Sequence, residues 1–225
     1  MSDLPILYSF RRCPYAMRAR IGLLEANIKV ELREIILRDK PQHMLELSPK
    51  ATVPVLLLPN GTVIDESLDI LLWALNQNDP NKLLTADPKT TNKLIEQTDS
   101  SKDSHFKHHL DRYKYATRYN NDDTQTSQQT TALTARIAAE TFIQTLETLL
   151  TDHQFLLANN PTLADYAIAP FVRQFANSGR EWWNAAPYPN TQKWLEAFIA
   201  SPTFQTIFQK FPLWQPGNSP LHFPT

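Results

Sequence analysis

Cys13 is the only cysteine in the 225-residue sequence, and its side chain is the one best suited to covalent chemistry. It precedes Pro14, a residue that favours the first turn of a helix, where its missing N–H costs nothing. A thiol at a helix N-terminus faces unpaired N–H groups and the positive end of the helix dipole, and both favour the reactive thiolate. Arginines at positions 11, 12, 18 and 20 add positive potential. The alternative is a small buried hydrophobic residue, as most free cysteines are.

The absence of a second cysteine limits this chemistry. Ala16 stands three residues after Cys13, where a dithiol oxidoreductase carries its second thiol. A mixed disulfide formed on Cys13 therefore needs an external thiol to release it. A single cysteine also forms no internal disulfide, which is typical of a reducing compartment.

The composition excludes several other classes of function. The 22 basic and 23 acidic side chains give a formal net charge of −1, so no general field attracts nucleic acid or an anionic membrane. The sequence also lacks basic segments interleaved with aromatic residues, which are typical of nucleic-acid binding. Its first residues do not read as a signal peptide, and no apolar run reaches the roughly 18 residues of a membrane span. We therefore expect a soluble, cytoplasmic protein.

The elements that must position Cys13 follow from the periodicity of the apolar residues. The predicted order is a strand at 4–9, a helix at 15–26, a strand at 30–37, a short helix at 41–47, strands at 53–58 and 62–64, and a helix that begins near Asp65 or Ser67. Asn60-Gly61 predicts a tight hairpin between the last two strands. This β-α-β-α-β-β-α order predicts a compact α/β domain over residues 1–78.

The rest of the chain is predicted to be a second domain. A polar segment at residues 79–88 contains two prolines and is the predicted linker. Beyond it the apolar spacing is helical, so residues 89–225 are expected to form an all-helical C-terminal domain. Thr162 and Asp165 have the spacing of a capping box at the start of one of these helices. With 42% hydrophobic residues over 225 positions, the chain is long enough to bury two cores.

Several motifs resemble those of the glutathione transferase superfamily. They are the segment from Leu7 to Arg20 around Cys13-Pro14-Tyr15, then Leu37-Arg38-Asp39-Lys40-Pro41, Ser48-Pro49-Lys50-Ala51-Thr52-Val53-Pro54-Val55-Leu56, Asp65-Glu66-Ser67, and the segment from Pro161 to Ala169. The Cys-Pro-aromatic element is most similar to the cysteine-type branch, the omega class and its bacterial relatives. The resemblance covers essentially the whole chain. It implies a thioredoxin-like, glutathione-binding domain followed by a helical domain.

The same resemblance implies roles for residues near Cys13. Cys13 would face the sulfur of glutathione and form a mixed disulfide with it. Val53-Pro54 matches a cis-proline turn whose Val53 backbone pairs with the cysteinyl unit of the tripeptide; without the resemblance a trans proline is expected. Tyr15 matches an aromatic residue that lines the site, and core packing is an equal alternative. Ala51 departs from the family pattern, which commonly has glycine before this turn.

The two ends of glutathione are assigned by the resemblance to residues farther along the chain. Ser67 matches the residue that binds the γ-glutamyl carboxylate, and Glu66 the residue near its ammonium group. A carboxylate at a helix N-terminus meets N–H donors and a favourable dipole, but simple capping by Asp65 or Ser67 is the alternative. Lys40 matches the basic residue that meets the glycyl carboxylate, with a solvated loop lysine as the alternative.

The implied activity is glutathione-dependent thiol transfer. Cys13 would attack a mixed disulfide or a similar small oxidant, and glutathione, as co-substrate, would resolve the product. The first alternative is conjugation of glutathione to an electrophile, with Tyr8 or Ser9 as the hydrogen-bond donor to the bound thiolate. The second is a non-catalytic interaction protein, because fold does not fix function. A homodimer is expected from the resemblance.

Three histidines form the remaining candidate site. His105, His108 and His109 share one predicted helical face, and the i,i+4 spacing of His105 and His109 is compatible with a metal site. No acidic base lies between them in the metalloprotease pattern. A solvated polar face is the preferred interpretation, so no metal is expected.

Overall fold

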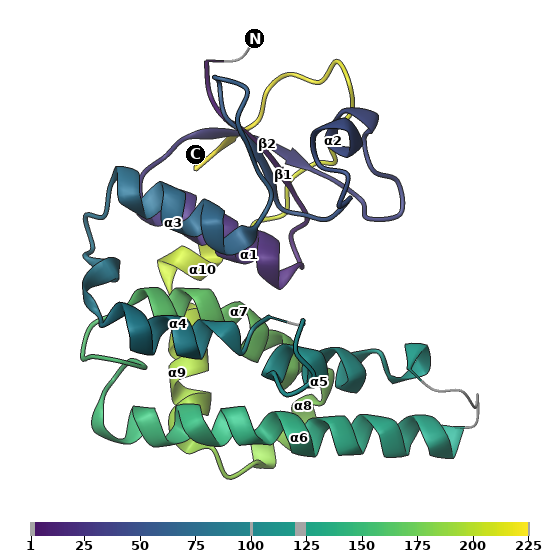
Figure 1. Ribbon diagram of the computed structural model, residues 1–225, viewed down its shortest axis with the longest axis vertical. Coiled ribbons are helices and arrows are strands. Elements are labelled where there is room, and N and C mark those ends of the chain that lie inside the picture. Colours follow the sequence, from purple (N-terminus) through teal and green to yellow (C-terminus); the bar gives the residue numbers. More distant parts are fainter. Residues whose placement is uncertain (1–2, 100, 120–124, 225) are drawn as a thin grey trace. The chain divides into compact units, whose positions relative to one another are not determined.

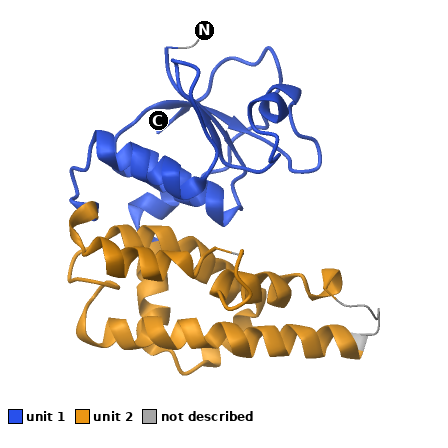
Figure 2. Cartoon of the chain, in the orientation of Figure 1, with its two compact units in different colours: residues 1–83, 199–225 blue, residues 84–198 orange. Residues whose placement is uncertain are grey.

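The computed structural model describes residues 3–99, 101–119 and 125–224, and the chain divides into two compact units (Figures 1 and 2). Unit 1 combines residues 1–83 with residues 199–225, and unit 2 contains residues 84–198. Within the described residues, no helix is both long enough and apolar enough to cross a membrane.

Unit 1 contains the predicted β-α-β-α-β-β-α order, which is therefore confirmed. Its elements are β1 (Ile6–Ser9), α1 (Pro14–Glu25), β2 (Val30–Glu34), α2 (Gln42–Leu47), β3 (Val55–Leu57), β4 (Val63–Ile64) and α3 (Ser67–Gln77). The strands lie in the sheet order β4-β3-β1-β2-β5. Strands β1 and β2 are parallel, with Leu7 opposite Leu32, and the pairs β1–β3 and β3–β4 are antiparallel.

The C-terminal residues differ from the prediction. Residues 199–225 were expected in an all-helical domain, but they belong to unit 1 and include the strand β5 (His222–Phe223) as well as helix α10 (Pro202–Ile207). Strand β5 pairs antiparallel with β2, and the Leu32 N–H donates to the Leu221 carbonyl over 2.7 Å. The chain thus leaves unit 1 within the predicted linker at residues 79–88 and re-enters it near residue 199.

The two faces of the sheet meet different helices because successive side chains of a strand point to opposite sides. Tyr8 contacts His43 of α2, whereas its neighbour Ser9 contacts Arg20 of α1. Helix α1 packs closely on α3 at Gly22, where an added Cβ would lie 2.7 Å from the Leu71 Cα. This close packing holds α1 against α3, the two helices whose N-terminal ends carry the candidate residues.

Unit 2 is helical in the residues that the structure describes. Its helices are α4 (Pro88–Glu96), α5 (Phe106–Lys114), α6 (Gln125–Asp152), α7 (Leu163–Ser178), α8 (Arg180–Ala185) and most of α9 (Pro189–Ala200), with 3₁₀ turns at Leu83–Thr85 and Ala116–Arg118. The polar segment 89–119 reads in the sequence as one long helix, and that prediction is wrong, because α4 and α5 are separate. Between them the Asp99 carboxylate accepts from the backbone and side chain of Ser101, a local bond that competes with helical hydrogen bonding.

The predicted interaction between Thr162 and Asp165 is present at the start of α7. One Asp165 oxygen accepts from the Thr162 N–H and hydroxyl, each at 2.8 Å, and the other accepts from the Leu156 N–H and Trp194 Nε1, each at 2.9 Å. Burial raises the pKa of Asp165, and these four donors oppose the rise. The carboxylate therefore joins three segments of unit 2.

Candidate active site

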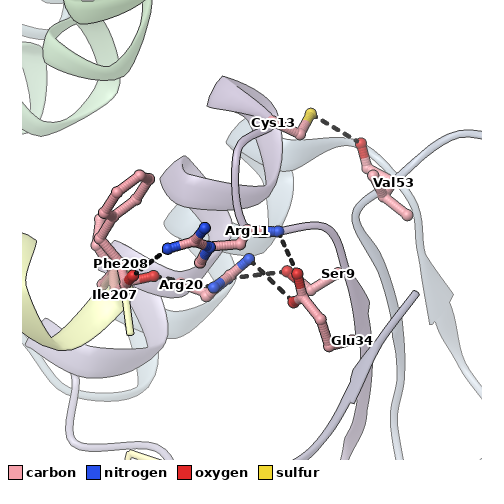
Figure 3. A network of polar contacts seen from close by, with 8 residues as sticks. All are labelled: Ser9, Arg11, Cys13, Arg20, Glu34, Val53, Ile207 and Phe208. Carbon is pink, nitrogen blue, oxygen red and sulfur yellow. Dashed lines mark hydrogen bonds and ion pairs between the residues drawn. The ribbon is translucent and has the colours of Figure 1, made fainter. Parts of the chain in front are cut away.

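Cys13 is the N-cap residue of helix α1, as the Cys-Pro sequence predicts. Its backbone is extended (φ −73°, ψ 124°), and its N–H donates to the Phe10 carbonyl over 3.0 Å, so the loop before the helix closes as a tight turn. The Sγ lies 3.8 Å from the Val53 carbonyl oxygen and donates a hydrogen bond to it (Figure 3). The half-buried thiol therefore lies between the helix end and the residue before Pro54.

The surroundings of Cys13 combine two opposing influences. The side chain packs against an apolar cluster that contains Tyr8, Ala16, Met44 and Val53, and these neighbours disfavour a charged sulfur. The N-terminus of α1 favours the thiolate through its dipole and its first N–H groups. The thiol is neither fully buried nor fully exposed. Its burial alone therefore does not support the interpretation of Cys13 as an inert core residue.

The turn that faces Cys13 has the geometry implied by the resemblance. The Val53-Pro54 peptide bond is cis, which confirms that expectation. Ala51, two residues earlier, has a positive φ of +54°, in the left-handed region where glycine is favoured. The family's preference for glycine at this position therefore has a backbone cause, and this chain tolerates alanine there.

Ser67 is the first residue of helix α3, and it is buried. Its hydroxyl oxygen accepts a hydrogen bond from the Arg18 guanidinium over 3.3 Å. The capping alternative is wrong, because the N-cap residue is Glu66 and its side chain makes no capping hydrogen bond. The Asp65 carboxylate accepts from the Ser48 hydroxyl at 2.6 Å instead.

Glu66 and Lys50 form an ion pair beside this helix end. The Glu66 side chain is exposed, and Lys50 also donates to the Asp65 carbonyl over 3.4 Å. An exposed ion pair of this kind contributes little to stability. Glu66 is therefore an accessible carboxylate next to Ser67.

Tyr15 and Lys40 occupy different parts of unit 1. Tyr15, in the first turn of α1, is half-buried and lies 6.0 Å from the Arg18 guanidinium carbon. Lys40 is half-buried just before α2, and among the described contacts none joins it to Cys13 or Ser67. The structure thus joins Cys13 with Val53, Ser67 with Arg18, and Glu66 with Lys50.

The two hydroxyls considered as alternative donors are engaged elsewhere. The Tyr8 oxygen lies 2.6 Å from both the Arg33 Nη1 and the His43 Nδ1, and its ring is fully buried. The Ser9 hydroxyl accepts from the Arg20 Nε at 2.8 Å. A cavity of about 550 Å³ next to Arg33, His43 and Trp214 does not include Cys13 in its lining.

Sequence reasoning missed the specific roles of two arginines on α1. Arg18 and Arg20 were counted only as positive potential, yet both are buried. Arg18 bonds Ser67, and Arg20 pairs with Glu34 at the end of β2. Burial lowers the pKa of Arg20 to about 10, while the charges of Glu34 and of Cys13 act in the opposite direction. The signal available in the sequence was that Arg18 and Arg20 lie among apolar residues of the helix predicted at 15–26.

Two of the three candidate histidines contact the loop that precedes α5. The His105 ring contacts the Asp99 carbonyl, and His108 Nδ1 lies 3.0 Å from the exposed Asp103 carboxylate. In the described part of the chain, no group of three or more His, Cys, Asp or Glu side chains is arranged to hold a metal ion.

Comparison with known proteins gives the family. A model described as "Glutathione S-transferase, N-terminal domain" matches residues 7–82, and one described as "Glutathione S-transferase, C-terminal domain" matches residues 107–197. The chain belongs to the glutathione transferase superfamily.

Individual relatives match over shorter stretches. The chain is 34% identical over 93 residues to glutathione S-transferase U22 of Arabidopsis thaliana. This match covers 39% of this chain and 41% of that protein. The chain is also 37% identical over 81 residues to glutathione S-transferase omega-1 of Rattus norvegicus. This match covers 36% of this chain and 33% of that protein. These matches span less than half the length of either relative.

One solved structure illustrates the shared fold. It is a glutathione transferase family member from Pseudomonas fluorescens with two glutathione bound, and it aligns with a TM-score of 0.74 over 92% of each chain. The sequence identity is 19%, so this similarity is one of fold.

Proposed function

We propose that this protein is a glutathione-dependent thiol transferase in which Cys13 is the nucleophile. In the first step the Cys13 thiolate attacks the glutathionyl sulfur of a mixed disulfide. The S–S bond of the substrate breaks, a Cys13–glutathione disulfide forms, and the substrate leaves as a thiolate that takes up a proton. In the second step the thiolate of another glutathione attacks the same glutathionyl sulfur, which releases oxidised glutathione and restores the Cys13 thiolate.

The observation that carries this proposal is the position of the Cys13 Sγ at the N-terminus of α1, 3.8 Å from the Val53 carbonyl. A nucleophilic cysteine needs a setting that favours its thiolate, and a helix N-terminus provides one. The occupied hydroxyls of Tyr8 and Ser9 also favour Cys13 over a hydroxyl donor. The protein contains one cysteine, so glutathione itself supplies the resolving thiol.

Glutathione is proposed to lie between Cys13 and the N-terminus of α3. The Val53 backbone would pair with its cysteinyl unit, Ser67 would bind the γ-glutamyl carboxylate and Glu66 its ammonium group. Lys40 would meet the glycyl carboxylate, and Tyr15 would line the site. The Pseudomonas fluorescens relative, whose structure contains glutathione, supports the choice of ligand. We also propose, from the family, a cytoplasmic homodimer that acts on a small disulfide or electrophilic substrate.

The variant Cys13→Ser tests the mechanism. A serine hydroxyl cannot form the mixed disulfide, so reduction of a glutathionylated substrate should fall to the uncatalysed rate. A serine can still donate a hydrogen bond to bound glutathione, so conjugation to a haloaromatic electrophile should persist or increase. Both activities are measured on wild type and variant, with glutathione affinity from calorimetry.

Tyr8→Phe is the matched control, because it removes a hydroxyl that is engaged with Arg33 and His43. It should keep both activities. Full disulfide reduction by Cys13→Ser would show that Cys13 is not the nucleophile. Loss of conjugation in Tyr8→Phe would identify Tyr8 as the donor, and glutathione binding without either activity in wild type would favour a non-catalytic protein.

A further inference from the structure

The loop from Phe10 to Arg12, which presents Cys13, is held by a buried carboxylate. The Arg11 N–H donates to Glu34 Oε1 over 2.5 Å (Figure 3). Glu34 is the last residue of β2, and its side chain is 6% exposed. The loop is therefore tied to the sheet two residues before the reactive sulfur.

Glu34 is in turn held by Arg20. The Arg20 Nη2 lies 3.4 Å from the second Glu34 oxygen, and Arg20 itself is fully buried. Its Nε donates to the Ser9 hydroxyl at 2.8 Å, and its Nη1 donates to the Ile207 carbonyl at 2.9 Å. One arginine thus connects β1, β2 and the end of α10.

The side chain of Arg11 is held from the C-terminal segment. Its Nη1 donates to the Phe208 carbonyl over 3.4 Å, and its guanidinium carbon lies 4.7 Å from the centre of the Phe208 ring. The backbone of this loop residue is therefore fixed by β2, and its side chain by a segment almost two hundred residues away.

We propose that Glu34 is a positioning residue for Cys13, whose carboxylate places the Phe10–Arg12 loop by bonding the Arg11 N–H with one oxygen and Arg20 with the other. The proposal rests on the proposed function, because it assigns the residue that orients its nucleophile. Only a side chain with two acceptor oxygens and the length of glutamate meets both donors from the end of β2.

The effect on Cys13 follows from the short path between the two residues. The Cys13 N–H bonds the Phe10 carbonyl, so a shift of Arg11 moves the turn that places the sulfur at the helix end. Displacing a reacting group by about 1 Å can lower a rate by about a hundredfold. The Cys13 charge also interacts with that of Arg20, so the same network contributes to the field at the sulfur.

Two conservative variants separate the reach of Glu34 from its charge. Glu34→Asp keeps the charge near Arg20 but is too short to bond both donors. Glu34→Gln keeps the length and an acceptor for the Arg11 N–H, but it removes the charge and places an NH₂ group where the second oxygen accepts from Arg20. The matched control is Glu31→Asp on the same strand, because Glu31 is also buried and ion-paired, with Arg33 at 2.7 Å, and does not contact the loop.

The main readout is the rate of Cys13 alkylation by iodoacetamide across pH 5–9, which requires no glutathione. Thiol-transfer kcat and KM are measured beside it, and urea unfolding shows that each variant is folded. We expect Glu34→Asp to lower the alkylation rate at neutral pH and the kcat by tenfold or more, with KM for glutathione changed by less than threefold. Glu34→Gln should lose less than Glu34→Asp, and Glu31→Asp should stay within twofold of wild type.

Three outcomes would overturn the proposal. The first is an unchanged alkylation rate in folded Glu34→Asp, which would make Glu34 a purely structural residue. The second is a greater loss in Glu34→Gln than in Glu34→Asp, which would mean that the charged contact with Arg20, and not the reach to the Arg11 N–H, matters. The third is an equal loss in Glu31→Asp. If wild type lacks thiol transfer, the proposed function fails, but the order of the alkylation rates still decides the role of Glu34.

Discussion

The Arg18 guanidinium donates a hydrogen bond to the Ser67 hydroxyl oxygen over 3.3 Å, and both residues are buried. A serine hydroxyl has one proton to donate and two lone pairs to accept with. Arg18 uses a lone pair, which leaves the proton able to donate to an anion. The arginine charge adds attraction for that anion, so the pair is suited to a carboxylate at the start of α3.

Ser67→Ala and Glu66→Gln should therefore weaken glutathione binding. A lost hydrogen bond to a charged ligand group costs roughly 1.5–3 kcal/mol, or about tenfold or more in affinity. Calorimetric titration measures the change. Asp69→Asn, on the exposed side of the first turn of α3, is the control and should bind within twofold of wild type. Equal affinity in Ser67→Ala would place the γ-glutamyl carboxylate elsewhere.

Ala51→Gly should stabilise the protein. The left-handed conformation costs an L-residue about 1–2 kcal/mol, which exceeds the roughly 0.5–1 kcal/mol that glycine loses through backbone entropy. We expect the free energy of unfolding in urea to rise by about 0.5–1 kcal/mol. Ala26→Gly, where φ is −83°, is the opposite case and should lower it. A loss of stability in Ala51→Gly would mean that the alanine methyl contributes packing that outweighs the strain.

His108 and His109 should make the protein less stable as the pH falls. Burial lowers the pKa of both residues, and the charge of Arg112 adds to this effect, while Asp103 opposes it. Because the unfolded chain takes up protons at the ordinary histidine pKa of about 6.5, protonation favours unfolding below that pH. The double variant His108→Gln/His109→Gln should therefore gain stability relative to wild type between pH 7.5 and 5.5, as followed by urea unfolding. A difference independent of pH would contradict the shifted pKa values.

Asp165→Asn should destabilise unit 2. The amide can keep the bonds from Leu156 and Trp194, but its NH₂ group would face the Thr162 N–H, which would then be buried without an acceptor. Such a donor costs roughly 1–3 kcal/mol. Thermal and urea unfolding measure the loss. A stability equal to that of wild type would mean that water or a rearranged Thr162 replaces the carboxylate.

The parts of the fold that could be predicted are local in sequence. Asn60-Gly61 marks a hairpin that the structure contains between β3 and β4, and Pro14 marks the first residue of α1. The Cys-Pro pair alone placed Cys13 at a helix N-terminus. Each of these signals depends on the conformational limits of one or two neighbouring residues, so no distant contact is needed to read it.

The contacts that could not be predicted join residues far apart in sequence. Arg18 meets Ser67 and Arg20 meets Ile207, but an arginine in a sequence is most often solvated, and nothing nearby identifies its partner. Strand β5 has two residues, too few for a periodic pattern, and its partner β2 lies almost two hundred residues earlier. The burial of these charged side chains and the pairing of the C-terminal segment with unit 1 both depend on tertiary contacts.

That return affects the order in which the chain can fold during synthesis. Residues 84–198 are continuous in sequence, so unit 2 is complete when residue 198 has left the ribosome. The outer edge of β2 stays without its neighbour until residues 221–223 have been made, and Phe223, which is fully buried in the folded unit, is added after the whole of unit 2. An open strand edge is a template for pairing with other chains. Unit 1 is therefore begun before unit 2 and completed after it, and the edge of β2 stays open to misassembly while the helical unit is translated.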